Sequence, residues 1–412
     1  GHTVLTFFKI VKLLKKKIRN INNMGNRNTT PFQNLKDLPN PLSESQCVLH
    51  KHEILICGGF YQSDCCYSYH ILKNEYEFIC VYPSDVRLNE HCVVKLIDNN
   101  DNNSKGSNAI SLLSFGGEYK HTLIMKYVSV WDNDNNENKM NKSKNYNEWM
   151  PLTDNHGHPI QIGREYDNYR GMRSVIGGSN NHLLFITYQR NNISVFNLNA
   201  FQFIRHDTFP TASFNFIRYH CFVSKSENGQ GQEMVKANQE KNIKNYEMLL
   251  FCYDTGLSIE YDEDNNTFQF DQLPVCKDIS SFNKYAYVCV NGIILFFGGW
   301  NDKKWTASKS VYKYSIQENK WTTFQNILPS PLYACAAILS EDDTHIHIIG
   351  GKNDIYITVS THVKTKVRAW DSSQLSKNEI KFVIQYWIRT LKIKLGWIDD
   401  FDKIIMKYSR MK

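Results

Sequence analysis

The sequence predicts an all-β fold built from six similar units, and three observations carry this prediction. Short apolar runs recur along the chain, and four of them end in Gly-Gly. Aromatic residues seven positions apart follow most of these runs, with polar, turn-forming residues between them. A segment near the end of the chain also has a near copy close to its start. Short strands, frequent turns and a repeated unit are typical of all-β repeat architectures.

The apolar runs are expected to be strands. Four are followed by glycines: ILICGG ends at Gly59, SLLSFGG at Gly117, IILFFGG at Gly299 and HIHIIGG at Gly351. LLFITY at 183–188 and LLFCYD at 249–254 lack the glycines. Six runs spaced roughly 45–70 residues apart indicate six units. RSVIGGSNN at 173–181 is followed closely by another apolar run, so it predicts a hairpin turn.

The glycine pairs have a physical interpretation. A strand that ends against a crowded neighbour needs residues without Cβ, because these let the chain turn and let large side chains approach. The structural glycines predicted in this way are Gly58, Gly59, Gly116, Gly117, Gly298, Gly299, Gly350 and Gly351.

The aromatic pairs predict hairpins, because the residues between them (LKNE, DEDNN, IQENK) favour turns. The pairs are Tyr69 with Tyr76, Phe196 with Phe203, Tyr261 with Phe268, and Tyr314 with Trp321. The second unit keeps the pair as Tyr127 and Trp149, with an insertion rich in Asn and Lys between them.

In this pattern the chain resembles the kelch family of β-propellers, whose unit is an apolar strand, Gly-Gly, and then a Tyr and a Trp at this spacing. The resemblance covers about residues 29–370 and is strongest over 294–321. It implies a six-bladed kelch-type β-propeller. A WD40 propeller is the alternative fold, because VSVWD (128–132) and VRAWD (367–371) end in Trp-Asp, but that alternative does not explain the Gly-Gly pairs.

The repeated segment predicts how the ring closes. KWTTFQNILPSPL (320–332) is the expected fourth strand of one blade with the linker after it, and TTPFQNLKDLPNPL (29–42) is its near copy. The last blade lacks a fourth strand of its own, and an open ring would expose unpaired backbone groups. We therefore expect the copy near the N-terminus to supply that strand. The alternative is that LP-x-PL is simply a common loop.

Both ends of the chain depart from the repeat pattern. We divide the chain into a leader at 1–28 that is disordered or not part of the native protein, a propeller at 29–375, and a helical segment at 376–412. Ser376 and Glu379 form a capping box, and two amphipathic helices are predicted after it. These helices pack on the propeller, bind a partner, or begin a further domain. If Met24 is the true start, Gly25 heads an M-G-x-x-x-[ST] motif for N-myristoylation.

Charge and cysteine content narrow the function classes. The net charge of +7 includes six uncompensated positives in the first 23 residues and a surplus of five over 376–412, so the middle carries −4. A basic groove for nucleic acid is not predicted. The eleven Cys are an odd number, contain no C-x-x-C pair and lie mostly in apolar runs. We interpret them as reduced, buried thiols of a cytoplasmic protein.

No catalytic or metal-binding motif stands out. H-E-x-x-H, P-loop and G-x-S-x-G patterns are all missing from the sequence. Some kelch propellers are copper oxidases, which implies a Tyr, two His and a cross-linked Cys on one face. The candidate His pairs are His50/His52, His156/His158 and His345/His347, and the last pair shares one face of a strand. Such a pair is more often one polar face of a strand than a set of ligands.

The sequence thus predicts a non-enzymatic protein-interaction module or scaffold, with no cofactor, no catalytic residue and no metal ligand. The alternatives are a metal-dependent oxidase resembling galactose oxidase, or a substrate adaptor of a ubiquitin ligase. The expected partner is a protein, and a membrane surface takes part only if Gly25 is acylated. No residue is assigned to partner binding.

Overall fold

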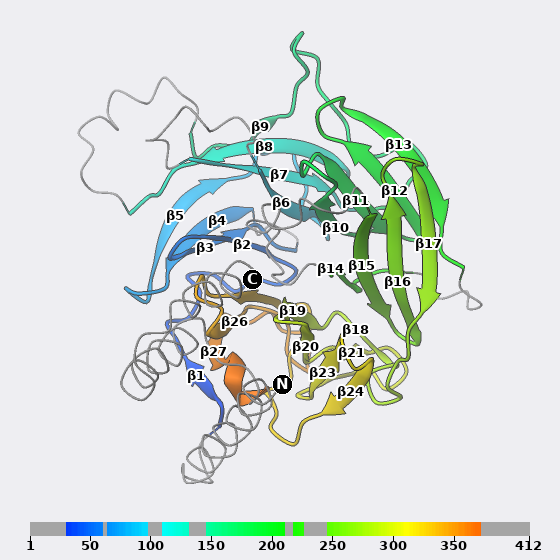
Figure 1. The fold of residues 1–412 in the computed structure, drawn as a ribbon. Coiled ribbons are helices and arrows are strands. Elements are labelled where there is room, and N and C mark those ends of the chain that lie inside the picture. Colours follow the sequence, from blue (N-terminus) through cyan, green and yellow to red (C-terminus); the bar gives the residue numbers. More distant parts are fainter. Residues whose placement is uncertain are drawn as a thin grey trace, which may run out of the picture.

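The computed structural model describes residues 30–60, 64–97, 109–131, 146–210, 217–225 and 245–371. Within these ranges the chain forms six four-stranded antiparallel sheets and one three-stranded sheet (Figure 1). The one helical element in the described ranges is a 3₁₀ turn, η4 at Val367–Ala369. The all-β class that the sequence predicts is confirmed. None of the described segments is a helix with the length and apolar character needed to cross a bilayer.

The first three sheets follow the chain from its N-terminal side. The first contains β2 (Gln46–His50), β3 (Glu53–Cys57), β4 (Cys65–His70) and β5 (Glu75–Val81). The second contains β6 (Cys92–Leu96), β7 (Ile110–Gly116), β8 (His121–Tyr127) and β9 (Met150–Pro151). The third contains β10 (Arg173–Gly177), β11 (Leu183–Tyr188), β12 (Asn192–Asn197) and β13 (Gln202–Thr208).

The remaining sheets complete the arrangement. The fourth contains β14 (Cys221–Ser224), β15 (Asn245–Cys252), β16 (Thr255–Asp262) and β17 (Thr267–Gln272). The fifth contains β19 (Ala286–Val290), β20 (Ile293–Phe297), β23 (Val311–Ser315) and β24 (Lys320–Thr323). The sixth contains β25 (Ala336–Leu339), β26 (His345–Ile349), β27 (His362–Lys366) and β1 (Phe32–Asn34). The three-stranded sheet contains β18 (Phe282–Asn283), β21 (Trp300–Asn301) and β22 (Thr306–Ala307).

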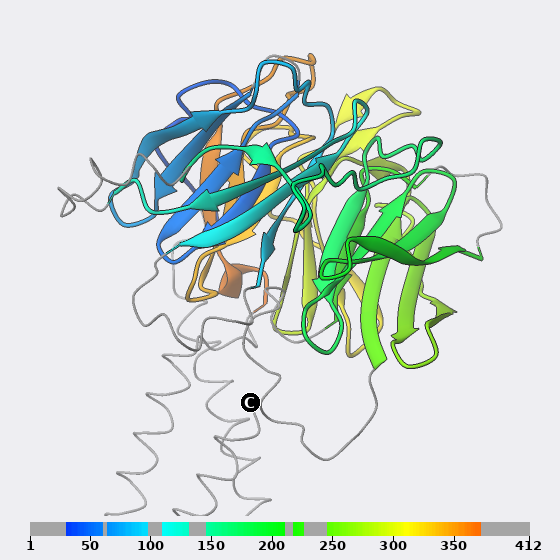
Figure 2. The ribbon, with the colours of Figure 1, turned by 90° about the horizontal axis from the view of Figure 1, so that it is seen from above.

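The first strands of the six sheets surround a common axis. β2 contacts β6 and β25, β6 contacts β10, β10 contacts β14, and β19 contacts β25. Figure 1 shows the sheets arranged about this axis, and Figure 2 shows them side by side. The predicted apolar runs form the second strand of each sheet. Strands β3 and β20 are buried at every position because a neighbouring sheet covers each face, whereas the fourth strands β5 and β17 are largely exposed.

Polar side chains directly before three of the first strands, β6, β14 and β19, link their sheets to the preceding ones. His91 Nε2 lies 3.3 Å from the carbonyl oxygen of Cys57, and the Tyr285 hydroxyl donates to the carbonyl of Phe251 at 2.7 Å. His220 Nε2 lies 2.6 Å from Thr187 Oγ1. Burial lowers the pKa of His91 to about 3, so this link is made by a neutral imidazole.

The sixth sheet joins the two ends of the described chain. β1 pairs antiparallel with β27, with Phe32 opposite Thr365 and Asn34 opposite Val363. The Thr365 hydroxyl also donates to the carbonyl of Pro31 at 2.8 Å. The fourth strand of this sheet therefore comes from the N-terminal side of the chain, as the repeated segment predicts.

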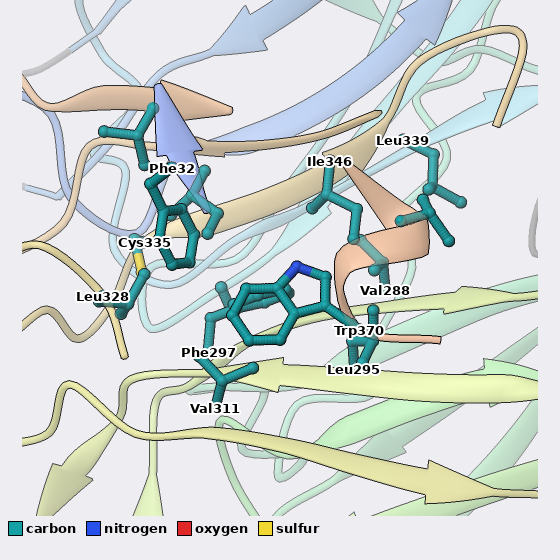
Figure 3. Close-up of a cluster of buried hydrophobic side chains, with 14 of the residues drawn as sticks. Phe32, Val288, Leu295, Phe297, Val311, Leu328, Cys335, Leu339, Ile346 and Trp370 are labelled. Atoms are coloured by element: carbon teal, nitrogen blue, oxygen red, sulfur yellow. The ribbon is translucent and has the colours of Figure 1, made fainter. Parts of the chain in front are cut away.

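An indole lies at the junction between the fifth and sixth sheets. Trp370 follows η4, and its ring centroid lies 5.5 Å from that of Phe32 and 5.1 Å from that of Phe324. Its Nε1–H donates to Thr365 Oγ1 at 3.0 Å. Figure 3 shows Phe32, Phe297 and Trp370 gathered in this apolar cluster. The two copies of the repeated segment thus each contribute one Phe to the same Trp.

Candidate functional site

Six residues occupy equivalent places two positions before the first strand of each sheet. All six have a positive φ, between 51° and 66°. They are Glu44, Glu90, Gly171, Tyr219, Lys284 and Ala334. Because the first strands surround the axis, these residues gather at one end of it, which we call the axial mouth.

Backbone hydrogen bonds connect neighbouring members of the axial mouth. The N–H of Glu44 donates to the carbonyl of Ala334 at 2.8 Å, and the N–H of Ala334 donates to the carbonyl of Lys284 at 2.8 Å. The N–H of Tyr219 donates to the carbonyl of Gly171 at 2.7 Å. A left-handed backbone is unfavourable for residues other than Gly, so these bonds help to hold four non-glycine residues in a conformation that each alone would avoid.

Charged side chains meet at the axial mouth. Lys284 Nζ lies 2.9 Å from Glu44 Oε1 and 3.9 Å from Glu90 Oε1, and it stands 3.8 Å from the ring centroid of Tyr219. The Tyr219 hydroxyl donates to Glu90 Oε1, and Arg170 Nε donates to Glu90 Oε2 at 3.2 Å. We call these five residues the mouth cluster.

Burial controls protonation within the mouth cluster. The side chain of Glu90 is only 1% exposed. Burial and the nearby charge of Glu44 raise the pKa of Glu90 to about 7, although Lys284 and Arg170 oppose the shift. Among the described residues, Glu44 Oε2 is buried and has no hydrogen-bond partner. The mouth therefore combines an unsatisfied buried oxygen with a carboxyl group whose pKa lies near neutral pH.

An exposed apolar patch lies on two turns of the fifth and sixth sheets. Trp305 is 69% exposed, Tyr356 52%, Ile355 64% and Ile357 55%. We call these four residues the aromatic patch. The buried Trp300 supports it, because its ring centroid lies 6.5 Å from that of Trp305 and 5.0 Å from that of Tyr356.

Asparagine side chains shape both turns of the aromatic patch. Asn301 Oδ1 accepts the N–H groups of Lys303 and Lys304, and Asn353 Oδ1 accepts those of Ile355 and Ile357. These are Asx turns, in which a short amide side chain replaces a backbone acceptor. Trp305 and Tyr356 have φ values of 55° and 65°. Two bulky residues are therefore held outward in left-handed turns.

The aromatic patch adjoins the axial mouth. Tyr333 packs against Trp300, with ring centroids 4.8 Å apart, and directly precedes Ala334 of the mouth. Tyr333 also pairs with Lys352, whose Nζ lies 4.2 Å from the ring centroid of Phe60. Burial lowers the pKa of Lys352, and the charge of Glu44 partly opposes that shift. Patch and mouth are thus neighbours joined through the buried residues Trp300 and Tyr333.

The aromatics that the sequence singles out lie within the sheets, whereas the glycines lie at the ends of the second strands. A Cβ on Gly117, Gly299 or Gly351 would meet residues that directly flank positions of the axial mouth. Gly58, Gly59, Gly298, Gly299, Gly350 and Gly351 follow the second strands β3, β20 and β26, while Gly116 ends β7 and Gly117 follows it. Four aromatic pairs are directly opposite each other across the third and fourth strands: Tyr69–Tyr76, Phe196–Phe203, Tyr261–Phe268 and Tyr314–Trp321. Trp149 instead stacks on Tyr82, with ring centroids 4.8 Å apart, and its partner in the sequence pattern, Tyr127, donates a hydrogen bond to Glu53.

The candidate His pairs do not converge on a common site. His50 is buried in β2 while His52 is exposed beside Glu341, and His158 bonds to Asp154 on an exposed loop next to His156. His347 Nδ1 lies 2.9 Å from His362 Nε2, while His345 contacts Thr344. In the described ranges no three His, Cys, Asp or Glu side chains are grouped so that they could hold a metal ion.

Several features fall outside what the sequence reveals or the structure describes. The six mouth positions hold five different residue types and share no sequence motif. Only their equal distance from a first strand identifies them, and that requires the structure. Gly25, the leader at 1–28 and the two helices predicted over 376–412 lie outside the described residues.

Comparison with known proteins supports the fold. The Kelch motif matches residues 284–326, which cover the fifth sheet. No curated protein matches the chain in sequence. The solved structure of YjhT is similar with a TM-score of 0.52 and 11% identity, and the match covers 80% of this chain and 95% of that one. At this identity the similarity concerns the fold alone. The resemblance to kelch-repeat β-propellers that the sequence predicts is therefore confirmed.

Proposed function

We propose that this protein is a non-enzymatic interaction module, a closed six-bladed propeller that binds a protein partner through the aromatic patch and the neighbouring axial mouth. The six four-stranded sheets are its blades, and β1 closes the ring. The observation that carries the proposal is the aromatic patch itself. Monomeric proteins rarely leave several large apolar side chains exposed together unless they bind something there.

The composition of this surface fits protein recognition. Aromatic residues are enriched in the centres of protein interfaces, where they bury much area at little entropic cost. Trp305 and Tyr356 are fixed by their turns, so binding costs little further ordering. The mouth cluster adds charge, since the side chain of Arg170 is 42% exposed, and this favours a partner with an acidic group there.

Affinity capture from native cells with matched variants tests the proposal. The test variant is Trp305→Ala/Tyr356→Ala, whose residues are 69% and 52% exposed. The control is Leu72→Ala/Phe78→Ala on the first sheet, whose residues are 72% and 53% exposed. We expect the test variant to recover at least about tenfold less partner protein, while the control recovers as much as the wild type. Equal recovery by both variants would contradict the proposal.

Further measurements separate the alternatives. Loss of every partner from a chain ending at Asp371 would place recognition in residues 372–412 and not on the propeller. Recovery of ubiquitin-ligase subunits through the aromatic patch would identify the module as an adaptor. Stoichiometric copper in the natively purified protein would favour the oxidase alternative. We place the module in the cytoplasm, and intact-mass measurement of the native protein tests whether Gly25 carries an acyl chain.

A further inference from the structure

Three cysteines form a row across the first sheet. Cys57 in β3 is the direct partner of Cys66 in β4, and Cys66 is the direct partner of Cys80 in β5. Partners across antiparallel strands project their side chains from the same face of the sheet. Cys57 and Cys66 are fully buried, and Cys80 is partly exposed. All three are free thiols.

The backbone spacing suits a disulfide between Cys57 and Cys66. The N–H of Gly58 donates to the carbonyl of Cys65 at 3.2 Å, so the adjacent pair Cys57/Cys66 occupies a position without mutual backbone hydrogen bonds. At such positions the Cα atoms are about 4.5 Å apart, within the range of about 4.4–6.8 Å that a disulfide requires. The strands therefore need little movement to form the bond.

Cys80 lies on the other side of Cys66. The N–H of Tyr82 donates to the carbonyl of Asp64 at 2.9 Å, and counting along the strands from this bond places Cys66/Cys80 at a hydrogen-bonded position. The Cα atoms of such pairs are about 5.5 Å apart, which a disulfide also accepts, so spacing alone does not separate Cys57 from Cys80. The register between β4 and β5 shifts between Cys66 and Tyr67, and this irregularity on the Cys80 side favours Cys57 as the partner.

The surroundings of Cys66 favour its thiolate. Burial alone would raise the pKa of Cys66, but hydrogen bonds from the thiols of Cys57 and Cys80, from Trp149 and from the Gly58 N–H lower it well below its ordinary value. Trp149 Nε1 lies 3.4 Å from the sulfur. The hydrogen bond to Cys66, together with burial, raises the pKa of Cys57. Cys66 is thus the nucleophile of the row, and Cys57 is the thiol that keeps its proton.

We infer that Cys66 is a site of oxidation by small hydroperoxides, and that Cys57 resolves the product as a Cys57–Cys66 disulfide. The inference is independent of the proposed function. The Cys66 thiolate attacks the peroxide, an S–O bond forms as the O–O bond breaks, and the leaving oxygen takes up a proton from solvent and departs as water or an alcohol. The sulfur of Cys57 then attacks the sulfenic acid, the S–S bond forms, and the oxygen leaves as water with the Cys57 proton. The two thiols lose two electrons, and the hydroperoxide gains them.

Position in the sheet predicts which oxidants react. Only Cys80, on the outermost strand, is partly exposed, while Cys66 is fully buried. Such burial favours a small oxidant such as hydrogen peroxide over a bulky one such as oxidised glutathione. We therefore expect oxidation by the first and not by the second.

Peptide mapping of the intact protein tests the inference. The full chain is treated with hydrogen peroxide under native conditions, remaining thiols are alkylated, and the cysteine pairs are read by mass spectrometry. We expect a Cys57–Cys66 link that dithiothreitol reverses. We also expect the Cys66 thiol to disappear at least about tenfold faster than that of Cys252, a buried cysteine whose thiol donates to the carbonyl of Arg218.

Two variants identify the roles. In Cys57→Ala we expect a sulfenic acid on Cys66, which dimedone traps when the oxidised protein is unfolded in its presence, with no link to Cys57 possible. In Cys80→Ala we expect the Cys57–Cys66 link to form as in the wild type. A link between Cys66 and Cys80 in the wild type, or oxidation of Cys66 no faster than that of Cys252, would overturn the inference.

Discussion

The segment 322–332 and its copy at 29–42 build the same kind of junction by different routes. The N–H of Gly299 donates to the carbonyl of Leu332 at 2.9 Å, and the N–H of Gly351 donates to that of Leu42 at 2.7 Å. In the fifth sheet the segment continues directly from its own hairpin. In the sixth sheet it comes from the opposite end of the described chain. The local sequence therefore forms the junction, and chain continuity is not required for it.

The two junctions differ in what holds them in place. β24 follows β23 through a short turn, whereas β1 must be brought back across the whole ring. The cost of closing such a long loop grows only with the logarithm of its length. Buried side chains offset it, since Phe32, Leu38 and Leu42 are all less than 10% exposed. Variants that remove the segment, disturb its packing on a glycine or truncate its Phe therefore test whether the two junctions contribute equally to stability.

The largest expected effect comes from removing the copy at the N-terminal side. A chain beginning at Ser43 lacks β1 and three buried apolar side chains, each worth roughly 2–4 kcal/mol. We expect its midpoint of thermal unfolding, measured by circular dichroism, to fall well below that of a chain beginning at Met24. Equal midpoints would show that β1 does not stabilise the ring.

The next effect compares the two glycines against which the linkers pack. A Cβ on Gly298 would clash with the carbonyl oxygen of Leu332, and one on Gly350 with that of Leu42. Both residues also have positive φ. We expect Gly298→Ala and Gly350→Ala each to lower the free energy of unfolding by about 3 kcal/mol or more, measured by denaturant titration.

Gly292→Ala is the matched control for this pair. Gly292 has a φ of 78° but open space around its Cβ position, so its cost should be only about 1 kcal/mol from the left-handed backbone. Unequal costs for Gly298 and Gly350 would mean that the two linkers do not pack alike.

The smallest effect concerns the two Phe residues beside Trp370. Phe32 is 8% exposed, whereas Phe324 is only partly buried. We expect Phe32→Ala to cost about 3 kcal/mol and Phe324→Ala about 1–2 kcal/mol less than that, because less area returns to water. Chemical denaturation of both variants measures the difference. A larger loss of unfolding free energy in Phe324→Ala than in Phe32→Ala would contradict the prediction, because the copy at 322–332 would then depend more on Trp370.

Particular residues show how far sequence reasoning reaches. The apolar runs and four of the aromatic pairs are predictable because strand alternation and hairpin turns are local properties. The pairing of β1 with β27 is predictable because Phe32-Gln-Asn and Phe324-Gln-Asn are nearly identical in sequence. In the sequence, the Trp-Asp of VRAWD is typical of a WD40 repeat. In the structure, Trp370 packs against both copies of the segment.

The candidate site depends on relations that no local pattern records. Glu44, Glu90 and Lys284 lie 46 to 240 positions apart, and only the common axis of the sheets brings them together. The row of Cys57, Cys66 and Cys80 depends on strand register, including a shift beside Cys66. Read singly, each of these cysteines looks like a small buried hydrophobe.

The pairing of β1 with β27 also has a consequence during protein synthesis. β1 leaves the ribosome more than three hundred residues before β27 is made. At usual translation speeds this is a wait on the order of tens of seconds. During that time Phe32 lacks its partners Phe297 and Trp370, whereas Leu38 and Leu42 can already pack on the first sheet. The newborn chain is therefore exposed to aggregation at β1, and in need of chaperones there, until β27 and Trp370 emerge.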